Sequence, residues 1–152
     1  MNTKLIALFG CVMLAPTLFG YCVYFKEGST GKIGVAIYKQ DQTKALTAVP
    51  IDYARLGTAS AEHRDMSPGS KACWNWKEIN KKLFSNKGNQ NTPLFFAVFN
   101  ATITKGAPLN VEILATGSLP LGGGLFIDKK DGKVIWQAYT FDNKLFASNT
   151  KA

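Results

Sequence analysis

Short runs of alternating apolar and polar residues, separated by turn residues, make up most of the chain after residue 20. In one such run Ile33, Val35 and Ile37 alternate with polar or small residues. A period of two is typical of a β-strand with one buried face. The runs that we predict as strands cover residues 21–26, 32–40, 45–53, 94–104, 109–116, 125–129 and 133–141. The pattern therefore predicts about seven strands.

The segments between these runs carry turn signals. Gly-Ser-Thr-Gly at 28–31 separates the first two runs, and Lys-Asp-Gly at 130–132 separates the last two, so we predict a hairpin at each place. Residues 57–70 lose the alternation, and we predict a long loop there that ends in the turn sequence Ser-Pro-Gly-Ser. The three glycines at 122–124 predict a bulge or a close backbone approach where the next strand begins.

One segment, residues 75–84, has the period of a helix instead. Its apolar stripe consists of Trp76, Ile79, Leu83 and Phe84, and its other face is charged. Residues 94–104 are apolar on both faces, which predicts a central strand that is covered on both sides. Together these elements predict an all-β protein with at most one short helix. We expect an antiparallel β-sandwich, immunoglobulin-like or jelly-roll-like.

The first 25 residues differ from the rest of the chain. Residues 5–25 carry no charged side chain and follow Lys4. That length could span a membrane. However, Pro16 interrupts the segment, the apolar block at 5–14 has the length of a signal-peptide core, and Gly20 is small enough for a cleavage site. We expect residues 1–20 to be a secretory signal peptide and 21–152 a single domain, with a membrane anchor extending to about residue 25 as the alternative.

The chain has three cysteines, and cleavage after Gly20 would remove Cys11. Cys22 and Cys73 would then meet an oxidising compartment, so we predict a disulfide between them. If Cys22 stays in the membrane or leaves with the signal, Cys73 is a buried free thiol. No CxxC pair occurs, which argues against cysteine-based redox chemistry and zinc binding.

The 152 residues include 18 Lys and Arg against 10 Asp and Glu, a formal net charge of +8. Only Arg55 and Arg64 are arginines. Sequence-specific nucleic-acid recognition relies on the bidentate arginine fork, so this composition argues against it. Lysine suits solubility or a diffuse attraction to an anionic surface.

A cluster of basic and aromatic residues lies between residues 71 and 87, where five lysines face one glutamate. Such residues can bind anionic polymers or lipid headgroups. The alternative is that the tryptophans belong to the core and the lysines only solvate the opposite face. The candidate binding residues are Lys71, Trp74, Trp76, Lys77, Lys81, Lys82 and Lys87.

Other candidate chemistry is sparse. The active site of a hydrolase would have to use the single histidine, His63, which lies between Glu62 and Asp65. No nucleophile elbow accompanies it. One histidine without a cysteine pair predicts no metal site, and the glycine-rich segments fit no nucleotide motif, so we expect no cofactor. The glycosylation motif at Asn100 falls in a predicted central strand, and we expect it to be unused.

The sequence thus predicts a small secreted, non-catalytic β-sandwich, extracellular or, in a bacterium, periplasmic. Its expected partner is another protein or an anionic glycan or surface. We expect membrane contact only through an uncleaved N-terminal segment or at the periphery. One alternative is a structural subunit that assembles by strand addition, for which 32–40 is the candidate edge strand. A second alternative is a secreted hydrolase centred on Glu62, His63 and Asp65. The sequence does not predict the oligomeric state.

Overall fold

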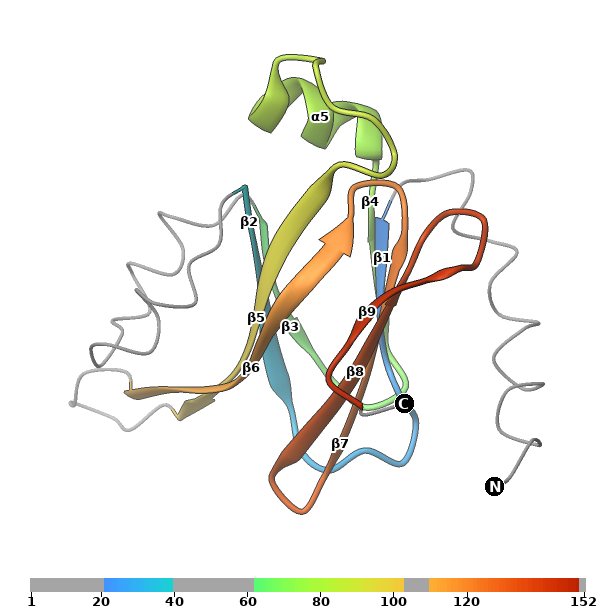
Figure 1. The fold of residues 1–152 in the computed structure, drawn as a ribbon. Helices are drawn as coiled ribbons and strands as arrows, with labels where there is room; N and C mark the ends of the chain where they lie inside the picture. The colour runs from blue at the N-terminus through green and yellow to red at the C-terminus, as the bar shows by residue number, and fades with distance from the viewer. Residues whose placement is uncertain (1–20, 40–61, 103–109, 151–152) are drawn as a thin grey trace.

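A computed structural model describes residues 21–39, 62–102 and 110–150, which form nine strands and one helix (Figure 1). The predicted signal peptide at 1–20 and the predicted strand at 45–53 lie outside these ranges. The elements are β1 (Tyr21–Phe25), β2 (Ile33–Tyr38), β3 (Glu62–Met66), β4 (Lys71–Trp74), α5 (Trp76–Phe84), β5 (Pro93–Thr102), β6 (Asn110–Pro120), β7 (Gly124–Lys130), β8 (Lys133–Tyr139) and β9 (Leu145–Ser148).

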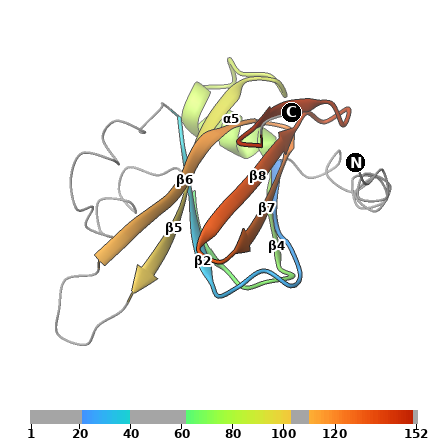
Figure 2. The same ribbon diagram turned by 60° about the horizontal axis from the view of Figure 1, so that its bottom comes forward.

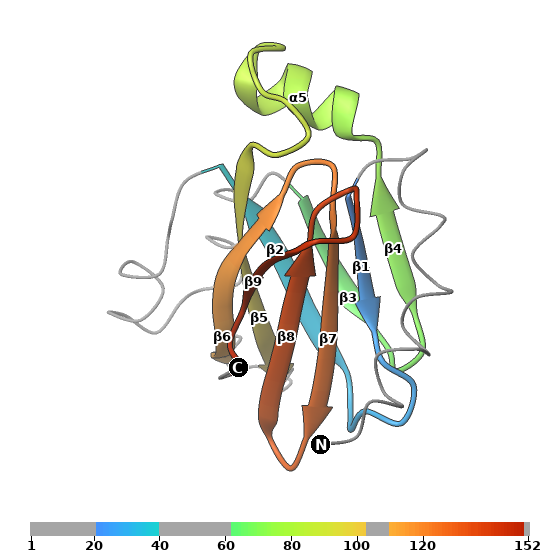
Figure 3. The same ribbon diagram turned by 45° about the vertical axis from the view of Figure 1, so that its right-hand side comes forward.

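Two sheets face each other (Figure 2), and α5 lies across one end of them (Figures 1 and 3). The strand order is β4-β1-β7-β8-β9 in one sheet and β3-β2-β5-β6 in the other. The all-β sandwich with a single short helix is therefore confirmed. Two details differ from the expectation: the described residues hold nine strands rather than about seven, and β1 pairs with β7 in parallel, so the first sheet is mixed.

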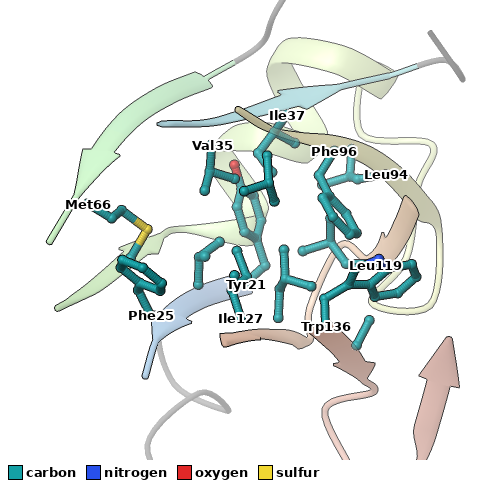
Figure 4. Close-up of a cluster of buried hydrophobic side chains, with 14 of the residues drawn as sticks. Tyr21, Phe25, Val35, Ile37, Met66, Leu94, Phe96, Leu119, Ile127 and Trp136 are labelled. Atoms are coloured by element: carbon teal, nitrogen blue, oxygen red, sulfur yellow. The ribbon is translucent and has the colours of Figure 1, made fainter. Parts of the chain in front are cut away.

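The hydrophobic core fills the space between the sheets with large side chains from both (Figure 4). The ring of Phe96 on β5 meets that of Trp136 on β8 edge to face, with the centroids 4.9 Å apart. Residues labelled in Figure 4 are Tyr21, Phe25, Val35, Ile37, Met66, Leu94, Phe96, Leu119, Ile127 and Trp136. Burial of this apolar surface supplies the main driving force for bringing the sheets together.

Strand β5 is central, as its sequence predicts. It pairs with β2 on one side and β6 on the other. One face contributes Phe96 to the core, while the other contributes Phe99 to a separate buried cluster that includes Tyr38. Burial raises the pKa of Tyr38 to about 12, so this hydroxyl stays neutral at physiological pH. The sheet is thus covered on both faces at this point.

The predicted hairpin between the first two strands is wrong, because β1 and β2 belong to different sheets. Their connection is attached to β7 instead. The backbone N–H of Thr30 donates to the carbonyl oxygen of Lys129 at 2.8 Å, and the hydroxyl of Ser29 donates to Asp128 at 3.1 Å. The glycines at 28 and 31, both with positive φ, let the chain turn from one sheet to the other.

Two further expectations need correction. The predicted loop 57–70 contains strand β3, and β4 follows this segment directly. Strand β3 is an edge strand rich in charged residues, and β4 is only four residues long. For these reasons neither strand shows an extended alternating pattern. Strand β2 lies between β3 and β5, so the segment 32–40 is not the free edge that strand addition would need.

Several predicted turns are confirmed. Strands β7 and β8 form a hairpin in which Asp131 and Gly132 both have positive φ, at 50° and 75°, as a two-residue turn of this kind requires. At the end of the 57–70 segment the N–H of Ser70 donates to the carbonyl of Ser67. A Cβ on Gly123 would lie 2.0 Å from the carbonyl oxygen of Tyr139, so the expected close approach of the backbone is present.

Candidate functional site

Helix α5 forms where its sequence predicts and begins at a capping residue. The side chain of Asn75 accepts a hydrogen bond from the backbone N–H of Lys77 at 3.0 Å, which satisfies one of the free donors of the first turn. Ile79 is buried, and Trp76, Leu83 and Phe84 pack against the core. The helix therefore docks by its apolar stripe and turns its charged face outward.

A buried asparagine fixes the segment that follows the helix. Asn80 is 6% exposed, and its side-chain amide both donates to the carbonyl of Gly88 and accepts from the N–H of Gly88, each at 2.8 Å. Such a pair of bonds replaces the water that the buried amide has lost. This role of Asn80 cannot be predicted from the sequence, because a polar residue beside the apolar stripe of a helix does not indicate which residue it will bond.

The exposed face of α5 and its surroundings carry five lysines, which we call the lysine cap: Lys39, Lys77, Lys81, Lys82 and Lys87. The neighbouring acidic residue on the helix is Glu78. Lys39, from the end of β2, joins the set because its Nζ lies 5.5 Å from the centre of the Phe84 ring. Helix α5, which carries Lys77, Lys81 and Lys82 and is followed closely by Lys87, lies at one end of the sandwich (Figure 3).

The two candidate tryptophans pack against the protein core, Trp74 almost completely and Trp76 in part. Trp74 is 8% exposed, and its ring stacks on that of Tyr21 with the centroids 4.8 Å apart. Trp76 is half-buried against the core. Arg64 of β3 lies over the Trp74 ring at 6.0 Å. Because both rings pack against other side chains, they help to hold the helix end of the sandwich together. The groups that the lysine cap exposes are chiefly ammonium groups.

Lys71 is also separate from the cap. It begins β4, at the end of that strand away from α5, and its Nζ lies 5.1 Å from the centre of the Tyr24 ring. Tyr24 stacks on Phe126, which in turn meets Tyr139 edge to face. These rings form a cluster distinct from the inter-sheet core. The structure therefore divides the predicted binding set between two places.

The predicted disulfide joins Cys22 on β1 to Cys73 on β4. The two residues are directly opposed in the antiparallel pair, with their Cα atoms 4.1 Å apart, and they are separated by 51 positions in sequence. Since β4 leads through Asn75 straight into α5, the bond fixes the strand from which the lysine-bearing helix starts.

The histidine segment forms strand β3 rather than a loop. The register places Glu62 opposite Ile37 and His63 opposite Ala36, and these two partners belong to clusters on opposite faces of the sheet. Arg64 and Asp65 are exposed. Among the described residues, no three His, Cys, Asp or Glu side chains come close enough to hold a metal ion. The hydrolase alternative stays a prediction.

A second group of charged residues lies at the opposite end of the sandwich, around β7. Lys26 forms an ion pair with Asp128 at 2.9 Å, and Ser29 donates to the same carboxylate. Partial burial alone would raise the pKa of Asp128, but these hydrogen bonds and the charges of Lys26 and Lys130 outweigh it, so the pKa lies below its ordinary value. The next residue, Lys129, is buried and reaches Asn100 of β5.

Comparison with known proteins adds no assignment to either group. No protein-family model matches this chain, and no match was found among curated proteins or solved structures. In the ranges that the structure describes, no helix is long and apolar enough to cross a membrane.

Proposed function

We propose that this protein is an exported, non-catalytic β-sandwich that binds an anionic surface, a glycan or a membrane face rich in acidic headgroups, through the lysine cap. The observation that carries the proposal is the orientation of α5: its apolar stripe is docked on the core, and Lys77, Lys81 and Lys82 are exposed on the other side. Export is supported by the apolar N-terminal segment of the sequence and by the Cys22–Cys73 disulfide.

Rigid mounting of the helix favours binding by the cap. The N-cap at Asn75, the Asn80–Gly88 pair and the Cys22–Cys73 bond all hold the helix or the segments next to it. Lysines on a fixed helix lose less conformational freedom on binding than lysines on a free tail. Binding of this kind is electrostatic, so it weakens as salt rises.

The test is binding of the purified protein to heparin-agarose and to phosphatidylserine-containing vesicles across a sodium chloride series. Each lysine near an anionic membrane contributes about 1 kcal/mol, so K77Q/K81Q/K82Q should weaken vesicle binding roughly a hundredfold at low salt. The matched control K32Q/K130Q/K133Q removes three exposed lysines at the opposite end of the sandwich and should retain most of the binding.

Three outcomes would count against the proposal. The wild-type protein could fail to bind either matrix at low salt, the α5 variant could bind as well as the wild type, or the control could lose as much as the α5 variant. The last result would mean that binding follows total charge rather than this surface. Circular dichroism of both triple variants checks that the fold is retained.

A further inference from the structure

Lys129 occupies a core position, which is unusual for a lysine. On β7 it has the same parity as Leu125 and Ile127, both of which face the inter-sheet core and are almost fully buried. Lys129 itself is 7% exposed. Lysine is almost never buried unless its charge is paired, because removing an ammonium group from water is costly.

The described side chains give this ammonium group one acceptor and no carboxylate. Its Nζ donates to the side-chain oxygen of Asn100 at 2.6 Å, and no salt bridge to Lys129 is present among them. Asn100 in turn donates to Glu112 of β6 at 3.3 Å. An ammonium group has three N–H donors, so the hydrogen-bonding capacity and the charge of Lys129 are only partly satisfied.

We propose that Lys129 is the anchor of a binding site for a small oxyanion, a carboxylate or phosphate group, at the end of the sandwich opposite α5. An oxyanion would accept the remaining N–H donors and supply the missing negative charge through short, charge-assisted hydrogen bonds. The site is independent of the lysine cap.

The β1–β2 connection lies next to the ammonium group. The backbone of this connection is tied to Lys129 by Thr30, whose N–H and hydroxyl both donate to the Lys129 carbonyl. At the next residue, Gly31, a Cβ would lie 3.9 Å from Nζ, and both Thr30 and Gly31 are exposed. The residue that borders Nζ on this connection is therefore an exposed one without a side chain.

Two acidic residues near Lys129 could compete with a bound anion for its ammonium group. Asp128 points to the other face of β7 and already accepts from Lys26 and Ser29. Glu112 is the nearest acidic residue in the hydrogen-bonded chain, and Asn100 stands between it and the lysine. Glu112 therefore opposes an incoming anion, and E112Q should strengthen oxyanion binding.

The experiment is a titration of isotope-labelled protein with sodium phosphate, and separately with sodium acetate, at ionic strength kept constant with sodium chloride. We expect saturable shifts of the Lys129 and Asn100 side-chain resonances; the probe that saturates first distinguishes phosphate from carboxylate. K129M should lower the affinity about tenfold or more, the effect of losing a hydrogen bond to a charged group, whereas E112Q should raise it severalfold. K77Q/K81Q/K82Q should leave it unchanged.

The proposal is overturned if neither probe produces saturable shifts, or if sodium chloride alone produces the same shifts. It is also overturned if E112Q leaves the affinity unchanged or lowers it, because the anion then does not bind within reach of the Glu112 charge, beside the hydrogen-bonded chain of Lys129, Asn100 and Glu112. The E112Q arm keeps the proposal testable even if K129M does not fold. Wild-type binding to heparin is scored separately, so failure of the lysine cap is distinguishable from failure of this site.

Discussion

At the scale of single residues, Asp128 shows how a loop sets the charge state of a strand residue. The hydrogen bonds from Lys26 and Ser29, both in or next to the β1–β2 connection, contribute to a lowered pKa of the carboxyl group. Because the folded pKa lies below the unfolded one, the interaction stabilises the fold fully above the ordinary aspartate pKa. This stabilisation is lost as the pH falls through the lowered value.

We therefore expect D128N to lower the free energy of unfolding by about 1 kcal/mol at pH 7, since the ion pair is partly exposed. The difference from wild type should vanish in acid, below the lowered pKa, where the wild-type carboxyl group is protonated too. Urea unfolding at a series of pH values measures both. D131N is the matched control, because Asp131 is exposed in the adjacent turn and asparagine tolerates its positive φ. Equal losses for D128N at neutral and acid pH would contradict the argument.

At the scale of elements, the sequence predicts which segments are strands better than it predicts which strands pair. Alternation marks β2, β7 and β8 correctly, and the helix stripe marks α5. Alternation does not encode a partner, so the glycine-rich segment at 28–31 resembles a hairpin although it crosses between sheets. Similarly, the lysine at 129 continues the apolar parity of its strand, a sign visible in the sequence, but only the fold shows that Asn100 meets it.

The Cys22–Cys73 bond is an element-scale constraint whose contribution can be measured. Closing a loop of this length restricts the unfolded chain, and the chain-entropy model assigns that restriction about 4 kcal/mol. C22A/C73A should therefore unfold at a clearly lower urea concentration than the oxidised wild type. The reduced wild-type protein should unfold close to the double variant. An unchanged midpoint in both would show that the pairing of β1 with β4 and the Tyr21–Trp74 stack already hold this edge without the bond.

At the scale of the whole molecule, charged residues of the described ranges gather at two ends of the sandwich that differ in their arrangement. At the α5 end, lysines cover a docked helix, while at the β7–β8 hairpin end Lys26 forms an ion pair with Asp128 and Lys129 is buried. Composition alone could not distinguish these arrangements, because it counts charges without their positions. The candidate tryptophans are a parallel case: in the sequence they lie between Lys71 and Lys77, but in space they pack against Tyr21 and the core.

The distance between the two sheets is also a property of the whole molecule, and a substitution at Gly117 on β6 can test how closely they are packed. A Cβ there would lie 2.4 Å from the Trp136 ring and 2.8 Å from the Phe96 ring, the pair that spans the sandwich. G117A must therefore push the sheets apart or displace a ring, at a cost of about 1–3 kcal/mol. G124A is the matched control, since its Cβ would meet its nearest neighbour at an ordinary 3.7 Å. Thermal unfolding should show a lower midpoint for G117A and little change for G124A. Equal unfolding midpoints for G117A and G124A would mean that the sheets or rings move aside for the added methyl group without loss of stability. The core would then be packed less tightly than the Phe96–Trp136 contact implies.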